Sequence, residues 1–412
     1  MHLVVFEDAN WIDFAPISIT HPVFAARVGL YSLLERQIRA FSPSKLTLWV
    51  QPELVEYCKK YLPEIAGLDV SYNTPLSSES AVLVNARFVP DSQIESGSLD
   101  GVHIDTHGQL CFAKINSPGL SADDVMQNSG KWQAVVHLGK SVGSLKTARY
   151  LWDLLTWNQN LLQKDIQEQL ATGKSAAKKS GPFHLVNESQ IFMGKNVKLG
   201  AGCVLDAEAG AIYLAADVVI SPNAVLQGPC YIGPKSQISP LASIRPGANI
   251  ASQCKVGGEV SNSIFMACSN KAHDGFVGDS YIGQWVNFGA GATTSNLKNT
   301  YGSISIRIGS RTISTGKQFL GSLVGDHTKF AIQTRLMTGS YIGYSCMIAV
   351  SSLTPTYVPS LTFLTDKGAA KYEIDKAREV MTSVMKRRGR EWDAADDAMM
   401  KYAEDAIADC EK

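Results

Sequence analysis

The sequence has neither an excess of one charge nor a long apolar run. Its 38 basic residues balance 38 acidic ones over 412 residues. Nucleic acid and anionic membranes are therefore not expected as main partners, because both select for basic chains. No stretch of about eighteen apolar residues occurs, which excludes a membrane-spanning helix. The first residues also lack the basic flank and apolar core of a secretory signal.

The eight cysteines form no C-x-x-C pair, so a zinc site is not expected. No metal site is predicted from the residue pattern. Free thiols in a chain of this length favour a reducing compartment, and we expect the protein in the cytoplasm.

A six-residue repeat dominates the second half of the chain. Aliphatic residues recur in one register at Leu214, Ile220, Leu226, Ile232, Ile238, Ile244, Ile250 and Val256. After a shift of two, the pattern continues at Ile264, Asn270, Phe276, Ile282 and Phe288. It resumes at Val324, Phe330, Leu336, Ile342 and Ile348.

Short strands joined by tight turns explain this period better than a helix. Six residues turn an α-helix by about 600°, so the apolar stripe would spiral around it. In a parallel β-helix each hexad forms one flat side, the aliphatic residue points inward, and coils stack at about 4.8 Å. The sequence therefore predicts a β-helix over residues 187–351. The six-residue period alone does not determine the handedness of the β-helix, although parallel crossovers are normally right-handed.

The repeat is broken in one polar stretch, residues 269–299. Asn270 and Thr294 occupy slots expected to point inward, and the pattern is interrupted from Leu297 to Leu323. Insertions in solenoids often mark the binding face. His273 could act there as a general base, because its ordinary pKa lies near neutrality. The alternative is a hydrogen-bonded structural histidine.

Two other interpretations concern single residue types. Arg245 could hold a phosphate with its planar fork, or be an ordinary surface arginine. A zinc-dependent β-helix enzyme would need three histidine ligands on adjoining coils. Only His273 and His327 lie in the regular downstream coils, which argues against that class.

The stretch SNKAHDGFVGDSYIGQWVNFGAGATTSN resembles the acetyltransferase domain of the GlmU-like family. These proteins combine N-acetylglucosamine-1-phosphate uridyltransferase and glucosamine-1-phosphate acetyltransferase activities. The resemblance implies a left-handed β-helix, acetyl-CoA as co-substrate, a homotrimer, and His273 as the base. The implied substrate-binding residues are Arg245, Ser261, Lys271, Phe276 and Asn287, and the implied acetyl-CoA contacts are Ala290, Asn296, Leu297 and Lys329.

Three positions depart from the family motif. Phe276 stands where the family has a tyrosine, Ser261 where it has a lysine, and Leu297 where it has a tyrosine. These departures affect the identity of the sugar more than the type of reaction. An acyltransferase acting on another amino sugar or nucleotide sugar is therefore one alternative, and a non-catalytic assembly or regulatory subunit is another.

Residues 1–165 alternate strand and helix patterns, which predicts an α/β domain with a parallel sheet. Strands are expected at HLVVF, KLTLWV and SAVLVNARFV, and helices over residues 28–41 and at VEYCKKYL. Such sheets bind ligands at the carboxyl ends of their strands. The domain order matches the GlmU-like family, and residues 6–37 resemble a divergent branch of sugar nucleotidyltransferases.

The first loop of this domain, FEDANWIDFAP, contains no glycine. Sugar nucleotidyltransferases carry a glycine-rich loop there, whose backbone amides hold the nucleotide phosphates. If the domain is active, the candidates are Asp8, Arg27, Asn85, Arg87 and Lys114, with a nucleoside triphosphate and magnesium. The alternative is a degenerate or architectural domain.

The remaining segments connect or cap these domains. Residues 166–186 become polar and rich in Ala, Lys and Gly, and we interpret them as a linker. Residues 352–412 are expected to form a helical tail with two helices separated by Gly389. Helical caps commonly protect the ends of solenoids.

Overall fold

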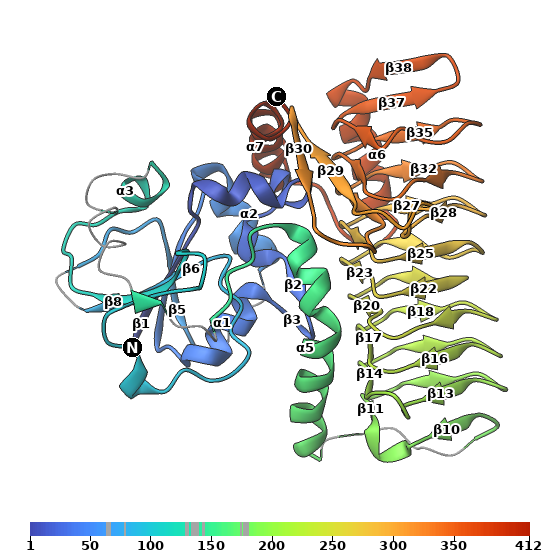
Figure 1. The fold of residues 1–412 in the computed structure, drawn as a ribbon, viewed down its shortest axis with the longest axis horizontal. Coiled ribbons are helices and arrows are strands. Elements are labelled where there is room, and N and C mark those ends of the chain that lie inside the picture. The colour runs from blue at the N-terminus through green and yellow to red at the C-terminus, as the bar shows by residue number, and fades with distance from the viewer. Residues whose placement is uncertain are drawn as a thin grey trace.

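The computed structural model describes residues 1–62, 67–77, 80–127, 132, 140–141, 145–173, 175 and 181–412. An α/β domain lies beside a tall prism of short stacked strands (Figure 1). The predicted fold class, an α/β domain followed by a parallel β-helix and a helical tail, is confirmed. In this part of the chain, no helix is both long and apolar enough to cross a membrane.

The amino-terminal domain is built on one mixed sheet with the strand order β5-β4-β1-β6-β8-β7-β9. Its parallel part comprises β5 (Asp69–Tyr72), β4 (Lys45–Trp49), β1 (His2–Phe6) and β6 (Ala81–Asn85). The rest comprises β8 (Leu110–Ile115), β7 (Val102–Ile104) and β9 (Lys140–Ser141). Because β1 and β6 are parallel neighbours, the residues that follow them meet at one edge of the sheet.

The first long helix starts later than predicted. Residues 28–41 were expected to be helical, but α1 spans Leu33–Phe41. A hairpin of β2 (Arg27–Val28) and β3 (Tyr31–Ser32) precedes it. Gly29 has a φ of +63°, which ends any helical run there. Ser32 then starts α1 through a capping box with Glu35.

The prism has three faces. The open face contains β10 (His184–Val186), β13 (Val204–Asp206), β16 (Val225–Gln227), β19 (Ser243–Ile244), β22 (Glu259–Ser261) and β25 (Phe276–Gly278). Above β25, β28 (Thr293–Thr294) and β33 (Arg335–Leu336) extend this side.

The covered face is the one next to the amino-terminal domain. It contains β11 (Ile191–Met193), β14 (Ile212–Leu214), β17 (Cys230–Ile232), β20 (Asn249–Ile250), β23 (Ile264–Phe265), β26 (Tyr281–Ile282), β31 (Ser322–Val324), β34 (Ser340–Ile342) and β36 (Tyr357–Val358).

The third face completes each coil. It contains β12 (Lys198–Leu199), β15 (Val219–Ile220), β18 (Gln237–Ile238), β21 (Lys255–Val256), β24 (Asn270–Lys271), β27 (Asn287–Phe288), β32 (Lys329–Phe330), β35 (Met347–Ala349), β37 (Thr362–Thr365) and β38 (Gly368–Lys371).

The inward register predicted after Val256 is wrong by one residue over three strands. Ile264, Asn270 and Phe276 were expected inside the prism. Their neighbours Phe265, Lys271 and Val277 pair instead with Ile250, Val256 and Val260, which point inward. The expected phase returns at Ile282.

Two short turns cause this slip. The inward residues Val256 and Val260 are four apart, and Val260 and Phe265 are five apart, instead of six. Ile264 added to the ambiguity because it is apolar while pointing outward, into the core shared with the amino-terminal domain.

The covered face carries a column of outward residues that pack on the amino-terminal domain and its connections. In register, the column is Phe192, Tyr213, Tyr231, Asn249, Ile264, Tyr281, Leu323, Tyr341 and Tyr357. Helix α5 (Leu151–Ala171) lies along the lower part of this face. One hydrophobic cluster therefore includes residues from both domains.

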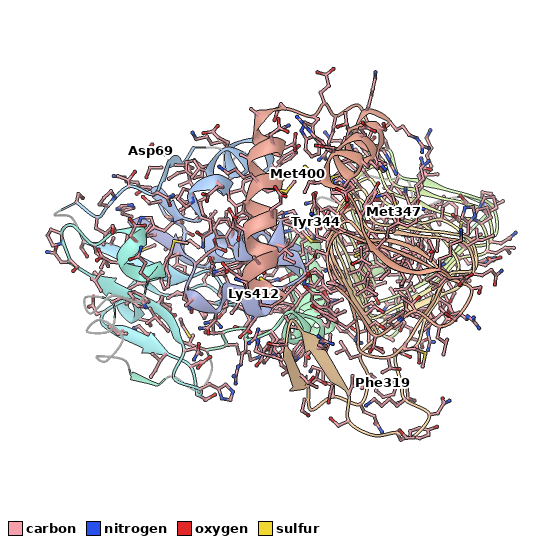
Figure 2. All side chains as sticks on the ribbon, turned by 90° about the horizontal axis from the view of Figure 1, so that it is seen from above. Asp69, Phe319, Tyr344, Met347, Met400 and Lys412 are labelled. Atoms are coloured by element: carbon pink, nitrogen blue, oxygen red, sulfur yellow. The ribbon has the colours of Figure 1, made fainter. Side chains whose placement is uncertain are left out.

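The tail closes the upper part of the seam between the domains. Helices α6 (Ile374–Lys386) and α7 (Ala394–Cys410) confirm the two predicted helices. Figure 2 shows α7 running along the seam, with Met400 near Tyr344 of the prism. On the other side, α7 packs on α2 (Val55–Tyr61), and the hydroxyl of Tyr402 donates to the carbonyl of Ser18 at 3.2 Å.

Three predicted segment boundaries differ from the structure. Coils continue through β36 and β37 beyond residue 351, because these strands pair with β34 and β35. The tail of residues 352–412 therefore begins with strands rather than helix. The predicted linker, residues 166–186, includes the last turns of α5 and the whole of β10. Residues 174 and 176–180 of that linker lie outside the described residues.

Candidate active site

His273 lies in the turn between β24 and β25, where the third face meets the open face. Its side chain is exposed, and in the described part of the chain its ring forms no hydrogen bond. The covered face, which carries the amino-terminal domain, is not part of this edge. The imidazole is therefore accessible for proton transfer to or from a bound molecule.

The backbone of this turn is held from three sides. Ser239 Oγ donates to the carbonyl of Ala272 at 2.9 Å, and Lys271 Nζ donates to the carbonyl of His273 at 2.5 Å. The backbone N–H of Gly291 donates to the carbonyl of Asp274 at 3.2 Å. Three consecutive carbonyls are thus fixed, so the turn presents His273 from a rigid support.

Lys271 was predicted to contact the substrate, but it points into the prism and is 1% exposed. Its ammonium group bridges the carbonyls of Gly257 (3.2 Å) and His273. Burial lowers the pKa of Lys271 to about 8, although the charge of Asp274 opposes this shift. In this structure Lys271 supports the His273 turn instead of facing a ligand.

Three other predicted sugar-phosphate contacts lie on the open face. Ser261 and Phe276 stand on β22 and β25, next to inward valines, and therefore point outward. Arg245 directly follows β19, and its Nη1 lies 2.8 Å from Glu259 Oε1. Both partners of this ion pair are about half exposed, so further guanidinium donors remain available to a phosphate.

Asn287 and Ala290 lie around the edge from these residues. Asn287 stands on β27 of the third face, directly above Asn270 in the ladder. Ala290 lies in the turn one coil above His273, because its neighbour Gly291 bonds to Asp274. Both positions adjoin the edge at which the third face meets the open face, which carries His273 (the His273 edge).

Asn296 and Leu297 lie at the opposite edge of the open face. They follow β28, and Asn296 Nδ2 donates to Asp279 Oδ2 at 2.6 Å. Asp279 connects β25 of the open face to β26 of the covered face. One chain therefore does not bring His273 and Asn296 to the same edge of the prism.

Lys329, predicted to contact coenzyme A, is engaged by backbone carbonyls. Its Nζ donates to the carbonyls of Trp285 (2.6 Å) and His327 (2.9 Å). Burial lowers its pKa to about 7, with Asp326 opposing the shift. Burial also lowers the pKa of His327 to about 3, so that its ring is neutral near pH 7. Lys329 is therefore not free for a ligand in this arrangement, whereas Nδ1 of His327 is buried without a hydrogen-bond partner in the described part of the chain.

A second polar cluster lies at the carboxyl edge of the amino-terminal sheet. Asp8 accepts bonds from Arg87 Nε (3.0 Å) and Asn85 Nδ2 (2.9 Å). Arg87 is 1% exposed and also donates to the carbonyl of Ala148 and to Gln109 Oε1, both at 2.9 Å. Burial alone would raise the pKa of Asp8, but the charge and hydrogen bonds of Arg87 outweigh it and lower the pKa.

The remaining predicted nucleotide contacts lie elsewhere. Lys114 pairs with Asp100 at 2.7 Å on the surface. Arg27 lines a cleft between the two domains, and none of Asp8, Asn85 and Arg87 lines that cleft. The structure thus groups three of the candidates and separates two.

The residues at this edge do not fit a magnesium ion. Both oxygens of Asp8 are engaged by neighbouring side chains. Burial raises the pKa of the adjacent Glu7 to about 8, so this carboxyl is largely protonated at neutral pH, and Glu7 accepts from the Val23 N–H at 2.7 Å. Within the described ranges, no three His, Cys, Asp or Glu side chains gather as a metal site would require.

Residues 3–173 match the family model described as sugar nucleotidyl transferase. The chain is also similar to bifunctional GlmU of Methanocaldococcus jannaschii, with 35% identity over 127 residues, 30% of this chain and 31% of the relative. The uncharacterized acetyltransferase YaiX of Escherichia coli is 29% identical over 171 residues, 41% of this chain and 74% of the relative.

A third relative is the bifunctional sugar-1-phosphate nucleotidylyltransferase/acetyltransferase of Sulfurisphaera tokodaii. It is 33% identical over 106 residues, 25% of this chain and 26% of the relative. The matched stretches thus span about a third of the length of the GlmU relative and a quarter of the Sulfurisphaera protein. The predicted resemblance to GlmU-like proteins is confirmed at this level.

Sequence reasoning missed how the two domains are joined. Asn249 interrupts the aromatic column of the covered face and donates to the carbonyl of Gly29 (2.6 Å) and to Asn158 Oδ1 (2.8 Å). His21 lies 2.6 Å from Asp326 and 2.8 Å from the hydroxyl of Tyr57. Outward aromatic residues occupy six of the nine positions in this column, and this recurrence was a signal that could have revealed the interface.

Proposed function

We propose that the protein transfers the acetyl group of acetyl-CoA to the amine of a hexosamine 1-phosphate. The observation that carries the proposal is the exposed imidazole of His273, presented by a turn whose three carbonyls are fixed. The relatives named as acetyltransferases support the reaction class. Arg245, Ser261 and Phe276 on the adjoining open face offer a surface for the sugar phosphate.

In the proposed reaction, His273 accepts a proton from the sugar nitrogen as that nitrogen attacks the thioester carbonyl. A C–N bond forms, the C–S bond of acetyl-CoA breaks, and the proton passes from the imidazolium to the leaving thiolate. Arg245 binds the phosphate, since its guanidinium fork matches phosphate oxygens. The products are an N-acetylhexosamine 1-phosphate and free coenzyme A.

We further propose a cytoplasmic homotrimer whose sites lie between subunits. His273 and the predicted acetyl-CoA contact Asn296 occupy opposite edges of the open face. A site that uses both needs the His273 edge of one copy beside the Asn296 edge of another. Three-fold head-to-tail contacts provide that arrangement.

Release of free thiol from acetyl-CoA tests this proposal. The full-length protein is incubated with acetyl-CoA and, in turn, glucosamine 1-phosphate, galactosamine 1-phosphate and an amino-sugar nucleotide. Mass spectrometry then identifies the acetylated product. Product from a hexosamine 1-phosphate supports the proposal. Product from the nucleotide sugar alone favours the alternative acceptor, which Phe276 and Ser261 leave open.

The amino-terminal domain supports a second candidate function, nucleotidyl transfer to a sugar 1-phosphate. The family match supports it, whereas the internal pairing of Asp8 with Arg87 favours an architectural role. Pyrophosphate release from nucleoside triphosphates with sugar 1-phosphates and magnesium separates the two. If neither thiol nor pyrophosphate is released with any substrate, a non-catalytic assembly or regulatory role gains support.

A further inference from the structure

A cleft of about 600 Å³ lies between the amino-terminal domain and the covered face of the prism. Arg27 and Tyr31 of the hairpin and Arg39 of α1 line one side. Tyr213 and Tyr231, from the outward column of the covered face, line the other. Its size is that of a site for a small organic ligand.

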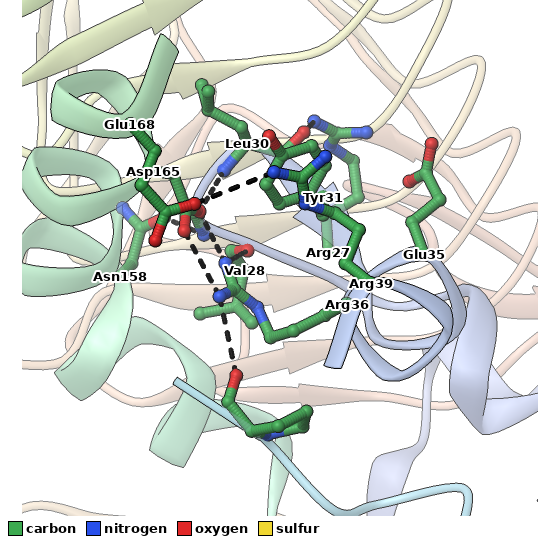
Figure 3. Close-up of polar contacts among 12 residues, drawn as sticks. Arg27, Val28, Leu30, Tyr31, Glu35, Arg36, Arg39, Asn158, Asp165 and Glu168 are labelled. Atoms are coloured by element: carbon green, nitrogen blue, oxygen red, sulfur yellow. Dashed lines mark hydrogen bonds and ion pairs between the residues drawn. The ribbon is translucent and has the colours of Figure 1, made fainter. Parts of the chain in front are cut away.

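The hairpin that carries Arg27 is fixed to both domains. The Arg27 N–H donates to Tyr281 Oη at 2.7 Å, and the Leu30 N–H donates to Asp165 at 2.9 Å. Figure 3 shows the hairpin beside α5, with Arg36 bonded to Asp165 and to the carbonyl of Val28. The backbone of the hairpin that carries Arg27 is therefore held in place before any ligand binds.

The charge of Arg27 has no counter-ion in the described part of the chain. One Nη donates to the carbonyl of Leu30 at 2.5 Å, and Nε is buried without a hydrogen-bond partner. Arg36, nine residues later, is more deeply buried, and its charge is neutralised by Asp165, although its Nε also has no hydrogen-bond partner. A buried polar group without a partner is costly, and a guanidinium binds anionic oxygens best.

Arg39 adds a second positive charge at the cleft. Its guanidinium lies 4.4 Å from the centre of the Tyr31 ring, and its Nη2 lies 3.5 Å from Glu168 Oε2, both partners being about half exposed. The acidic residue of the cleft, Glu35, accepts bonds from the N–H (2.7 Å) and hydroxyl (2.8 Å) of Ser32. The lining of the cleft thus includes two arginines and one carboxylate, and of the two arginines only Arg39 forms an ion pair with a described residue.

The opposite wall offers flat aromatic surface. Tyr213 and Tyr231 lie 5.5 Å apart between ring centres, and Arg27 stands 5.6 Å from the centre of the Tyr231 ring. Tyrosine rings pack against the faces of nucleobases and sugars. Arginines on one wall and tyrosines on the other match a ligand with an anionic group attached to a ring.

We propose that this cleft binds a phosphate ester of a ring, either a nucleotide or a sugar phosphate, with Arg27 on the phosphate and Tyr231 beside the ring. Such a ligand contacts both domains at once and strengthens their docking. The site is separate from the Asp8 cluster and from the His273 turn. It does not depend on the acetyl transfer proposed above.

Calorimetric titration of the full-length protein tests this site, without acetyl-CoA or magnesium. The probes are uridine monophosphate, glucosamine 1-phosphate and inorganic phosphate. At least one ring-bearing probe is expected to bind, and more tightly than inorganic phosphate. Arg27→Met should weaken that binding by about tenfold or more, because a charge-assisted bond is lost. Arg149→Met is the matched control, since Arg149 stacks on Tyr150 outside the cleft.

Further variants keep the result interpretable if Arg27→Met does not fold. Arg39→Met alters an exposed side chain of the same cleft, and Tyr231→Leu removes the ring; each should weaken binding of the ring-bearing probe several-fold. Binding by neither ring-bearing probe to the unaltered protein overturns the proposal. The proposal is also overturned if the ring-bearing probe still binds to Arg39→Met and Tyr231→Leu but not to Asp8→Asn. That result would place the ligand at the carboxyl edge of the amino-terminal sheet.

Discussion

The protein contains two polar clusters that differ in whether their charges are satisfied internally. At the amino-terminal sheet edge, Asp8, Asn85 and Arg87 bond to one another. At the prism edge, three backbone carbonyls of the His273 turn accept hydrogen bonds, while its imidazole has no hydrogen-bond partner among the described residues. A fixed backbone with an unbonded side chain is suited to proton transfer, whereas an ion pair whose groups bond only to each other and to neighbouring side chains stabilises the folded domain. The following predictions test this difference.

Mixed subunits should show the largest effect, since the proposed site draws on two copies. His273→Ala and Asn296→Ala should each be inactive alone in acetyl-CoA-dependent thiol release. Random mixing of the two in trimers should restore about a quarter of the unaltered activity, because one pairing in four joins two intact edges. No recovery after unfolding and refolding together, with trimers confirmed by light scattering, would place both residues in the same subunit's site.

Arg87→Met should destabilise the amino-terminal domain by about 2–4 kcal/mol, because it leaves the mostly buried Asp8 without its counter-ion. Urea unfolding measures the change. Lys114→Met is the matched control, since it breaks an exposed ion pair in the same domain, and it should leave the midpoint unaltered. Thiol release by folded Arg87→Met should match that of the unaltered protein. A loss of thiol release would show that the two clusters work together.

Lys271→Met should change how stability depends on pH. In the folded protein the Lys271 pKa is about 8, below its ordinary 10.5. Between these values the unfolded chain holds more protons, so the unaltered protein gains stability relative to Lys271→Met as pH rises. The gain should be about 1–3 kcal/mol. Urea unfolding of both proteins from pH 7 to 10.5 measures this difference in the free energy of unfolding. A difference that stays constant over this range would contradict the lowered pKa of Lys271.

Arg245→Met should have the smallest effect on stability, below about 1 kcal/mol, because its ion pair with Glu259 is exposed. If Arg245 binds the sugar phosphate, the KM for that substrate should rise about tenfold with little change in kcat. Glu259→Gln is the control, since it removes the same ion pair but keeps the guanidinium. An equal rise in KM for both variants would argue against a phosphate contact.

Much of the prism could be predicted because every coil places its inward aliphatic residues in the same way. The aliphatic residues from Leu214 to Val256 are core, as the six-residue step indicates. The register failed where turns shorten near Val260, and where Ile264 is apolar on an outward position covered by the other domain. Apolarity marks burial, but it does not tell which of two cores a residue joins.

The candidate site was less accessible to sequence reasoning. A motif gives only the order of residues along the chain. In the prism these residues lie at different edges, so His273 and Asn296 are found at opposite edges of the open face. The inward position of Lys271 follows from the short turns, which the motif does not reveal. The domain seam depends on pairs such as His21 and Asp326, about three hundred residues apart, and no local pattern predicts those.

The most direct test compares thiol release from acetyl-CoA and glucosamine 1-phosphate by the unaltered protein, His273→Ala and His184→Ala. His184 is an exposed histidine at the far end of the same open face, so it controls for the loss of a surface imidazole. We predict that His273→Ala lowers the rate by about 10²–10⁴-fold, as expected for a general base. His184→Ala should keep the full rate, and both should unfold as the unaltered protein does. Full activity in folded His273→Ala would contradict the assignment of the base.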